Sequence, residues 1–479
     1  MDTPKQIIAR KEEITTLREL YRKRSSELVS ITGRRRVGKT FLVDTLFAGK
    51  IDFKLVGVQN GSREVQLNNF GRVMARLRGT SIREATPTSW QFAFFALEDY
   101  LRSLDKSEKL VLFFDELPWI ATPKSGFLQS LGHFWNSWAE RENILIIICG
   151  SAASWMINKV VRHKGGLHNR LTRRIHLAPF TLLETQRYLE EKGFDLSRYD
   201  IAELYMIMGG IPYYLEALDR NLSVAQNVDR LALTANGVLH DEFNRLYPAL
   251  FDKAERHTEI VRALAKHHYG LDRQQIIKST SLSDGGGLSS TLDELEFSGF
   301  IHGYYLFDKK KRYKRYRLID EYSNFYLKFV ETNKEEGQNI WERLSTTPAY
   351  RSWTGYAFEN LGLRHLAQIR KALGIAGVST KTSTFYHPGN EFARGVQIDL
   401  LIERADRAIN LCEFKFYRSV VSLTKEQIQN LRERKQAFRQ LTQTDFTLFT
   451  SLVSPYGINP ASNKGGIVNQ SVTLDDLFS

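Results

Sequence analysis

Short apolar runs alternate with helix-like segments over the first third of the chain. Four of these runs are almost continuously hydrophobic and are predicted as strands, at residues 28–32, 53–58, 110–114 and 144–149. Continuous hydrophobicity is typical of strands in a parallel sheet that is covered on both faces. The helix-like segments between the runs therefore predict repeated strand–helix–strand units over the first zone.

The remaining chain changes character twice. Helical spacing with few strand signals comes first, followed by three short helices and a hairpin, and then by a mixture of helices and strands after a polar segment at residues 332–338. The predicted domains are 1–180, 181–250, 251–335 and 345–479. The helices predicted in the last two domains lie at 259–268, 272–280, 288–299, 353–373 and 425–440. The strands predicted there lie at 299–307, 313–319, 397–402 and 408–416.

Composition and charge narrow the class of protein. The 479 residues are 42% hydrophobic and 25% charged, which fits globular domains and not collagen-like, coiled-coil or long disordered chains. Two cysteines, Cys149 and Cys412, are too few for a disulfide framework or a cysteine-rich zinc site. No apolar stretch approaches the roughly 18 residues of a membrane helix and residues 1–13 are polar, so we expect a cytoplasmic protein with no membrane partner and no signal peptide. The net charge of +13 indicates attraction to a polyanion.

A glycine-containing basic loop follows the first predicted strand. It fits the pattern G-x-x-x-x-G-K-[ST], and a helix over residues 41–47 is predicted directly after it. Glycines allow such a backbone to turn its N–H groups toward phosphate oxygens, while Lys39 would meet the β- and γ-phosphates and Thr40 would hold Mg²⁺. The sequence therefore predicts an ATP-binding loop made of Gly33, Arg34, Arg35, Arg36, Val37, Gly38, Lys39 and Thr40.

Polar residues after two later strands complete the predicted nucleotide site. Asp115 and Glu116 end the strand at 110–114, where Asp115 would help to hold Mg²⁺ and Glu116 would polarise the attacking water. Ser151 follows the next strand and either senses the γ-phosphate or only forms a turn. Arg170 is the favoured γ-phosphate sensor among several neighbouring arginines, and the alternative is a solvated basic face.

Taken in order, these segments resemble the archaeal-type ATPase family of prokaryotes, which lies close to the AAA+ and STAND ATPases. The resemblance covers about residues 1–330 and implies an ATPase core with a helical lid, whose Gly210 and Pro212 face the nucleotide. Arg10 is left without a nucleotide role, because Ile8-Ala9 departs from the family's N-terminal pattern. The segments that carry the resemblance are the phosphate loop, 113–119, 150–151, 169–172, 179–180 and 209–215.

The hairpin of the third zone ends in a strongly basic tip. Seven of the nine residues 309–317 are Lys or Arg, with tyrosines between them. Three helices and a hairpin predict a winged helix, and this tip would neutralise phosphates of DNA. The predicted helix at 288–299 is acidic, which argues against base reading in the major groove. The alternatives are a solvated hairpin and a winged helix that packs against protein.

Two predicted strands of the last zone carry acidic residues that would meet across a hairpin. Asp399 lies in the first strand, and Glu413 and Lys415 share one face of the second because side chains alternate along a strand. Carboxylate oxygens suit Mg²⁺, which would polarise a scissile phosphate, and Lys415 would orient water or stabilise charge on the phosphate. Glu359, on the preceding helix, is a further candidate metal ligand.

This arrangement resembles the PD-(D/E)xK nuclease superfamily, and in particular the C-terminal domain often fused to archaeal-type ATPases. The resemblance implies metal-dependent phosphodiester cleavage by Glu359, Asp399, Glu413 and Lys415, although Val396-Gln397 stands where the namesake pattern has proline. The alternatives are a degenerate nuclease fold that only binds nucleic acid and surface charge on an unrelated domain. Together the two resemblances imply a multidomain α/β protein, with a P-loop parallel-sheet ATPase core, a helical lid, a winged helix and an α/β/α restriction-endonuclease-like domain.

The leading hypothesis is an enzyme, an ATPase whose nucleotide state gates a nuclease. ATP and Mg²⁺ would be its cofactors, and DNA is favoured over RNA as its nucleic-acid partner. The alternative is a STAND-like ATP switch that binds DNA or a protein without cleavage. A third hypothesis, an ATP-driven translocase, would require ring assembly, so a homo-oligomer is a further candidate assembly. A role in genome defence rests on analogy between folds.

Overall fold

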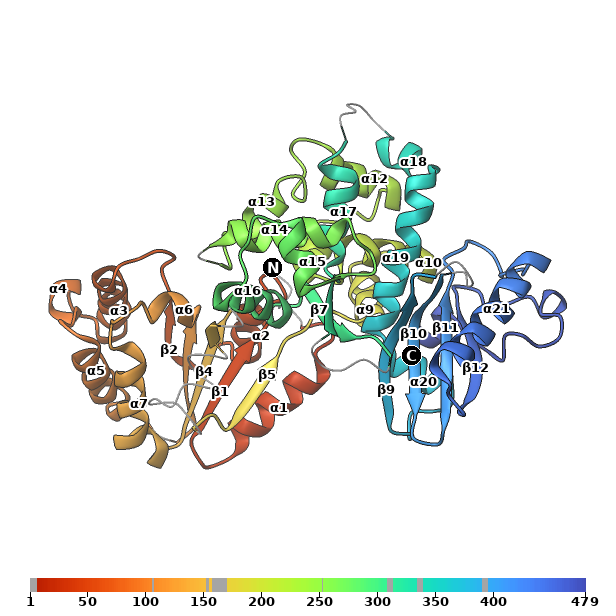
Figure 1. The fold of residues 1–479 in the computed structure, drawn as a ribbon. Coiled ribbons are helices and arrows are strands. Elements are labelled where there is room, and N and C mark those ends of the chain that lie inside the picture. The colour runs from red at the N-terminus through yellow and green to blue at the C-terminus, as the bar shows by residue number, and fades with distance from the viewer. Residues whose placement is uncertain are drawn as a thin grey trace. The chain divides into compact units, whose positions relative to one another are not determined.

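The chain folds into two compact units in the computed structural model. Residues Met1–Pro179 form the first unit and Phe180–Ser479 form the second. Each unit contains its own β-structure with helices packed around it (Figure 1). The structure describes residues 7–105, 107–151, 155–156, 170–251, 253–307, 313–333, 339–389 and 395–479.

The first unit is built on a parallel sheet of five strands in the order β2-β3-β4-β1-β5. Its strands are β1 (Glu27–Thr32), β2 (Ile51–Val56), β3 (Leu110–Asp115), β4 (Ile144–Gly150) and β5 (Arg173–His176). The four apolar runs of the sequence correspond to the first four strands, with β2 displaced by two residues from its predicted position. The fifth strand escaped prediction because its sequence is mostly charged and only Ile175 is buried.

Helices cover both faces of this sheet. They are α1 (Lys11–Arg22), α2 (Lys39–Leu46), α3 (Arg63–Arg78), α4 (Ile82–Ala85), α5 (Trp90–Arg102), α6 (Leu117–Ile120) and α7 (Phe127–Ser137). The longer ones begin where serine side chains cap them, since Ser62 and Ser89 each accept a hydrogen bond from the backbone N–H three residues later. Helices α3, α5 and α7 lie on one side of the sheet, and α1 and α2 lie on the other (Figure 1).

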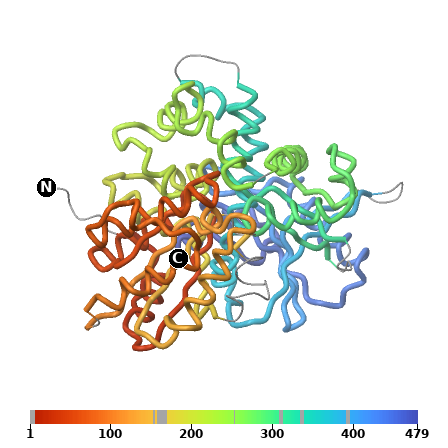
Figure 2. The backbone as a smooth tube through the Cα atoms, turned by 90° about the vertical axis from the view of Figure 1, so that its left-hand side faces the viewer, coloured from red at the N-terminus to blue at the C-terminus, as the bar shows by residue number. Residues whose placement is uncertain are grey.

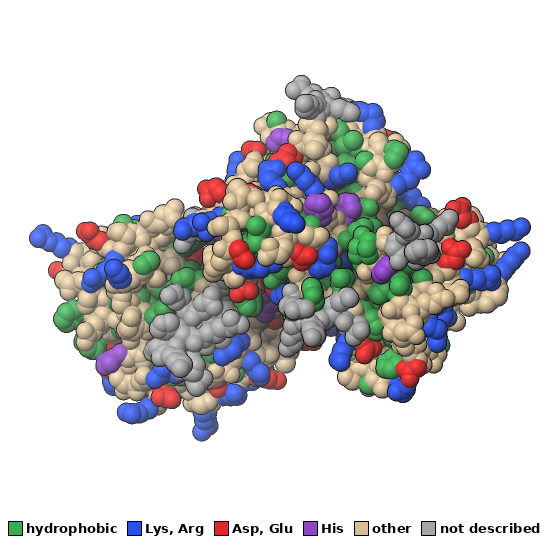
Figure 3. Space-filling view, viewed as in Figure 1, with side chains coloured by type: hydrophobic (Ala, Val, Ile, Leu, Met, Phe, Trp, Pro, Cys, Tyr) green, Lys and Arg blue, Asp and Glu red, His purple; other side chains and the backbone are tan. Residues whose placement is uncertain are grey.

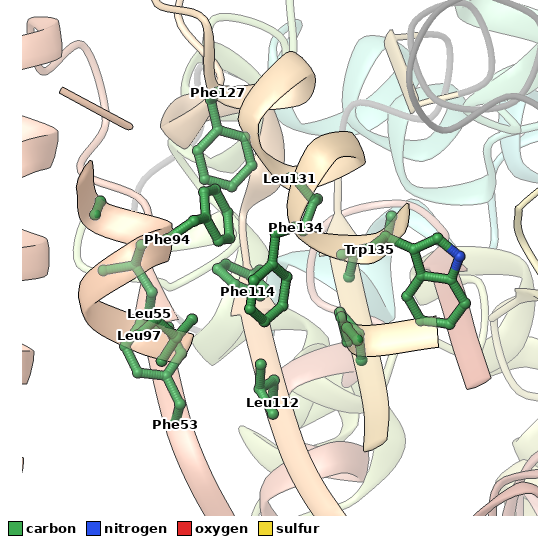
Figure 4. Packing of buried hydrophobic residues seen from close by; sticks show 14 of the residues in the cluster. Phe53, Leu55, Phe94, Leu97, Leu112, Phe114, Phe127, Leu131, Phe134 and Trp135 are labelled. Atoms are coloured by element: carbon green, nitrogen blue, oxygen red, sulfur yellow. The ribbon is translucent and has the colours of Figure 1, made fainter. Parts of the chain in front are cut away.

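An aromatic core holds α5 and α7 against the sheet (Figure 4). Phe94 of α5 and Phe134 of α7 lie 5.2 Å apart between ring centroids, and Phe114 of β3 lies 5.9 Å from Phe127. Each of these side chains is at most 3% exposed, so each buries enough apolar area to stabilise the fold by roughly 2–3 kcal/mol. Because this packing fixes the position of β3, it also fixes the backbone from which the acidic residues at its carboxyl end project.

The second unit begins with a helical zone. Its helices are α9 (Leu182–Glu191), α10 (Arg198–Met208), α11 (Pro212–Glu216), α12 (Val224–Val228) and α13 (Glu242–Leu246). The turn between α10 and α11 requires glycine, because Gly210 has φ 61° and a Cβ there would lie 2.4 Å from the Phe180 carbonyl oxygen. The Phe180 N–H donates to the Gly210 carbonyl at 2.8 Å. Pro212 then occupies the first turn of α11, as predicted from the sequence.

The next zone contains three helices and a small antiparallel sheet of order β6-β8-β7. Its elements are α14 (Ala254–Ala265), β6 (Leu271–Asp272), α15 (Arg273–Ser279), α16 (Gly286–Phe297), β7 (Ile301–Tyr305) and β8 (Lys314–Leu318). These are the elements expected for a winged helix, although α14 begins five residues before the predicted helix. Residues 309–312 of the predicted basic tip lie outside the described residues. The winged-helix interpretation stays a prediction.

The last zone is a mixed sheet of order β13-β12-β11-β10-β9 with helices against it (Figure 2, blue). Its strands are β9 (Thr380–His387), β10 (Val396–Arg404), β11 (Ala408–Phe414), β12 (Thr447–Val453) and β13 (Gln470–Val472). Two helices precede this zone, α17 (Glu321–Phe325) and α18 (Ile340–Leu344). The helices of the zone itself are α19 (Pro348–Arg364), α20 (Leu366–Ala372), α21 (Lys425–Thr442) and α22 (Leu474–Leu477). Strands β9–β10–β11 are antiparallel, whereas β11–β12–β13 are parallel.

Helices pack on opposite faces of this mixed sheet. Phe438 of α21 contacts a cluster that includes Leu411 of β11. Phe358 of α19 packs against Phe414 of the same strand, with ring centroids 6.0 Å apart. Since residues 411 and 414 point to opposite faces of a strand, the domain has three layers.

The helix predicted over residues 353–373 is broken at His365. The imidazole is only 1% exposed, and its Nδ1 lies 2.8 Å from the Leu361 carbonyl oxygen. The Leu182 N–H, at the start of α9, donates to Nε2 at 3.1 Å. Both ring nitrogens are therefore used by the neutral tautomer, and the break satisfies a backbone N–H of another helix. Sequence periodicity cannot signal such a partner.

Charge is distributed over the molecule. On the face drawn in Figure 3, Lys and Arg side chains are interleaved with Asp and Glu. Among the described residues, no helix is both long enough and apolar enough to cross a membrane. Both cysteines, Cys149 and Cys412, are buried and form no disulfide bond with each other.

We predict that His365 makes the second unit less stable in acid. Burial lowers its pKa from 6.5 to about 4, so its contribution is complete above pH 6.5 and is lost as the pH falls toward 4. Between pH 7 and pH 5 this amounts to about 2 kcal/mol of unfolding free energy. Urea unfolding of wild type and His365→Gln at both pH values measures the difference. Equal pH dependence in the two proteins would contradict the prediction.

Candidate nucleotide and nuclease sites

The phosphate loop spans the gap between β1 and α2. Gly33 has φ 151°, and a Cβ there would lie 2.3 Å from the Leu177 carbonyl oxygen, so only glycine fits. Gly38, at φ 90°, provides the turn into α2. Leu177 itself is held by its N–H, which donates to the Thr32 carbonyl at 2.7 Å. The end of β5 therefore shapes the loop.

Lys39, near the end of the phosphate loop, is buried. Its Nζ donates to the carbonyl oxygens of Gly33 at 2.9 Å and Arg34 at 3.0 Å. Burial lowers the pKa of Lys39, and the carboxylates of Glu116 and Asp115 oppose this shift. An ammonium held by neutral carbonyls can exchange those contacts for phosphate oxygens, which would compensate its charge more fully.

The carboxyl ends of β3 and β4 meet the loop. The Thr40 hydroxyl donates to Asp115 Oδ2 at 2.7 Å. The Ser151 backbone N–H and hydroxyl both donate to Glu116 Oε2, at 3.2 and 2.9 Å. Thr40 and Asp115 thus form one pair of oxygen donors suited to Mg²⁺, and Ser151 fixes the orientation of Glu116.

Glu116 is held in an unusual backbone conformation. Its φ is 49°, in the left-handed region, directly after β3 and at the start of α6. Non-glycine residues rarely adopt this conformation, and they concentrate at functional sites where surrounding structure enforces it. The geometry projects the carboxylate from the strand end toward Ser151.

Arg10 lies at the phosphate loop, although the sequence gave it no role. Its guanidinium donates to the Val37 carbonyl at 3.3 Å, and the residue is 5% exposed. The sequence signal for this contact was an arginine before the first helix. It was obscured because residues 8–9 depart from the N-terminal pattern of the archaeal-type ATPase family. Within the loop, Arg34 is buried and Arg36 has φ 72°, while Arg35 is partly exposed.

Two other predicted nucleotide residues belong to other segments of the chain. Arg170 Nε donates to Asn136 Oδ1 at the end of α7. Pro212 belongs to the second unit, at the start of α11. Neighbouring residues 157–169 of the predicted arginine segment lie outside the described part of the chain. The nucleotide roles of Arg170 and Pro212 stay predictions.

The second unit gathers charged residues at the centre of its mixed sheet. Glu413 of β11 forms ion pairs with Lys415 at 2.8 Å and with Arg434 of α21 at 2.7 Å. Burial acts to lower the pKa of Lys415, but the Glu413 carboxylate raises it overall. The two residues share one face of the chain, as strand alternation predicted.

Asp399 and Glu359 lie near Glu413. Burial and the Glu413 charge raise the pKa of Asp399, while Gln397 donates to its Oδ1 at 2.8 Å. Burial and the Asp399 charge raise the pKa of Glu359 well above its usual range. Carboxylates that repel each other in a buried position favour protonation or a bound cation.

The donor chemistry of this acidic group fits Mg²⁺, but its arrangement is looser than a formed metal site. Asp399, Glu413 and Glu359 supply hard oxygen donors of the kind that Mg²⁺ prefers. Across the described ranges, however, no three His, Cys, Asp or Glu side chains are already placed to hold one metal ion. Glu413 would have to exchange an ion pair for the metal.

Comparison with known families assigns the N-terminal region. Residues 7–218 match the family model described as an ATPase domain predominantly from Archaea. This region is therefore similar to archaeal-type ATPase domains. The domain includes the phosphate loop, the Asp115–Glu116 pair, Ser151 and Pro212.

The match does not extend over the rest of the chain, but individual proteins resemble longer stretches. The uncharacterized protein MJECL04 of Methanocaldococcus jannaschii is 23% identical over 397 residues, which cover 82% of this chain and 83% of that protein. The Walker-type ATPase PABY2304 of Pyrococcus abyssi is similar at 19% identity and a TM-score of 0.49, over 67% of this chain and 96% of its own. The ORC2 protein of Aeropyrum pernix in its ADPNP–ADP complexes is similar at 13% identity and a TM-score of 0.43, over 72% and 97%.

In the ATPase domain, we predict that Ser151→Ala lowers the rate of ATP hydrolysis about 10-fold and leaves nucleotide affinity unchanged. The variant removes a hydrogen bond that orients Glu116. Glu116 is the predicted general base, and general acid–base catalysis contributes roughly 100- to 10,000-fold to a reaction rate. Steady-state hydrolysis and fluorescent-nucleotide binding measure the two quantities. Ser30→Ala is the matched control, because Ser30 is buried on β1 and its hydroxyl has no partner among the described residues. An unchanged rate, or a loss confined to affinity, would contradict the role.

Proposed function

We propose that this protein is an ATPase whose nucleotide state controls metal-dependent cleavage of nucleic acid, with DNA as the favoured substrate, by its C-terminal domain. The observation that carries the nuclease part is the gathering of Asp399, Glu413 and Lys415 from adjacent strands, with Glu359 beside them. The ATPase part rests on the domain match and on the contact between Thr40 and Asp115.

The ATP half assigns a task to each residue of the first site. Lys39 binds the β- and γ-phosphates, and Thr40 with Asp115 would hold Mg²⁺. Glu116 accepts the proton of the attacking water, in an orientation fixed by Ser151. Arg170 as γ-phosphate sensor and Pro212 as lid contact belong to the same proposal, as does assembly with further copies of the chain.

The nuclease half assigns the second site. Asp399 and Glu413 would hold Mg²⁺, with Glu359 as a further ligand, and the ion would supply Lewis-acid activation of the scissile phosphate and of water. Lys415 stabilises negative charge that develops on the phosphate. Its raised pKa keeps it cationic at neutral pH.

A second candidate function is a STAND-like switch that binds DNA or a protein without cleavage. The ion pairs of Glu413 favour it, because two cations already neutralise this carboxylate. A degenerate nuclease fold would retain such pairs as structural links. The two candidates differ in whether Asp399 matters for cleavage.

For the ATPase half, we expect Lys39→Ala to reduce ATP hydrolysis roughly 100-fold or more, because it removes the ammonium that would meet the phosphates. The measurement is phosphate release by the full chain. Lys50→Ala, an exposed lysine beyond α2, is the control and should hydrolyse at the wild-type rate. Hydrolysis that survives in Lys39→Ala would refute the ATP site.

For the nuclease half, Asp399→Asn should abolish Mg²⁺-dependent cleavage of plasmid, linear and single-stranded DNA. The amide keeps the size of the side chain and removes a charged donor. Asp406→Asn, at the exposed β10–β11 turn, is the matched control. Gel assays with and without ATP also measure the coupling. If Asp399→Asn cleaves as well as wild type, the switch without cleavage becomes the better description.

A further inference from the structure

A cleft opens between the winged-helix zone and the mixed sheet, both within the second unit. Its volume is about 520 Å³, within the range of roughly 300–1,000 Å³ typical of ligand pockets. Strand β8 and the segment after α14 line one side, and strands β9 and β10 line the other. Glu359 and Asp399 of the acidic group face it.

Arg317 of β8 is one of the residues that line this cleft. The residue is 5% exposed, and its Nε has no hydrogen-bond partner among the described residues. Its guanidinium is 5.7 Å from the centre of the Tyr304 ring. The carboxylates of Glu359 and Asp399 interact with it electrostatically, yet it forms no ion pair with either in the part of the chain that is described.

A buried guanidinium without a bonded anion is costly unless something else compensates it. Arg317 and the two carboxylates of Glu359 and Asp399 all line the cleft. A phosphate there would accept hydrogen bonds from the guanidinium on one side and share a cation with the carboxylates on the other. The arrangement therefore fits a phosphodiester better than a neutral ligand.

The rim of the cleft carries further positive charge and exposed rings. Lys266 and Lys278 are exposed at its edge, and Arg315 is fixed by donating to the Gly270 carbonyl at 2.7 Å. Tyr269 and Tyr386 are 43% and 48% exposed along the same walls. Cationic side chains alternating with aromatic rings are the pattern that binds single-stranded nucleic acid, because phosphates pair with the cations and bases stack on the rings.

We propose that this cleft binds a single nucleic-acid strand and that Arg317 contacts the phosphate presented to the acidic group. The proposal rests on the proposed nuclease function and names the substrate class of that site. The winged-helix zone then serves the site through its inner strand and through the residues after α14. It does not require the outer tip of the hairpin.

The test is fluorescence polarisation of the full chain with a labelled 12-nucleotide strand in EDTA, where no cleavage occurs. We expect the double variant Lys266→Ala/Lys278→Ala to bind about 10-fold more weakly. Its log–log salt slope should be smaller by about 1.4, since each phosphate contact on a single strand contributes about 0.7. The matched control is Lys371→Ala/Lys464→Ala, which removes two exposed lysines of the same unit that do not line the cleft.

Arg317 is examined with two substitutions because it is buried. Arg317→Gln should lose binding about 10-fold, and Arg317→Lys should recover most of it, with unfolding transitions reporting whether each variant folds. DNA and RNA strands of one sequence identify the preferred backbone, and binding of either supports the cleft when the rim variant weakens it. Duplex that binds as tightly as the single strand would overturn the single-strand assignment.

The outcome separates this inference from the proposed function. Wild-type affinity and salt slope in the rim variant would overturn the cleft even if the protein cleaves DNA. Conversely, weakened binding in the rim variant supports the cleft even if wild type cleaves nothing, in which case only the nuclease proposal fails.

Discussion

Buried charge is the constraint around which both candidate sites are built. An ion removed from water must be matched by partners, or it shifts its pKa and destabilises the fold. In the first unit the ion is Lys39, which is held by loop carbonyls and by nearby carboxylates. In the second unit the ions are Arg317 and the acidic group, whose charges are only partly paired. Each site thus contains buried charge that its protein partners compensate only in part, and a bound ion of opposite charge can complete the compensation.

Sheet topology positions these charges. Parallel strands bring their carboxyl ends to one edge, so Asp115 and Ser151 lie near the loop that follows β1, with β4 between β3 and β1 in the sheet. In the mixed sheet a hairpin brings charged residues together, because antiparallel β10 and β11 place Asp399 near Glu413. Helices on both faces then exclude water from the strands.

The sequence predicts the parts of the molecule that local pattern determines. Continuous apolar runs located β1, β3 and β4, and the phosphate loop was readable because glycines and Lys39 act within one short segment. Strands such as β5 and β9 are edge strands with polar sequences, so no periodicity distinguished them. The role of Ser151 as a phosphate contact or a turn stays a prediction, and the sequence did not signal that its side chain bonds to Glu116. The contacts of Arg10 and His365 could not be assigned, because their partners lie far away in the chain. Arg317 was predicted as part of the basic hairpin tip, whereas it is buried on β8.

The packing of Gly33 against the Leu177 carbonyl has a consequence for how the loop can be varied. A short peptide that contains only β1, the loop and α2 would lack the surface that gives the loop its curvature. Transfer of residues 33–40 into another scaffold should therefore transfer a sequence without its shape. The shape of the phosphate loop in this protein thus depends on the sheet around it, because the residue that follows the fifth strand packs against Gly33.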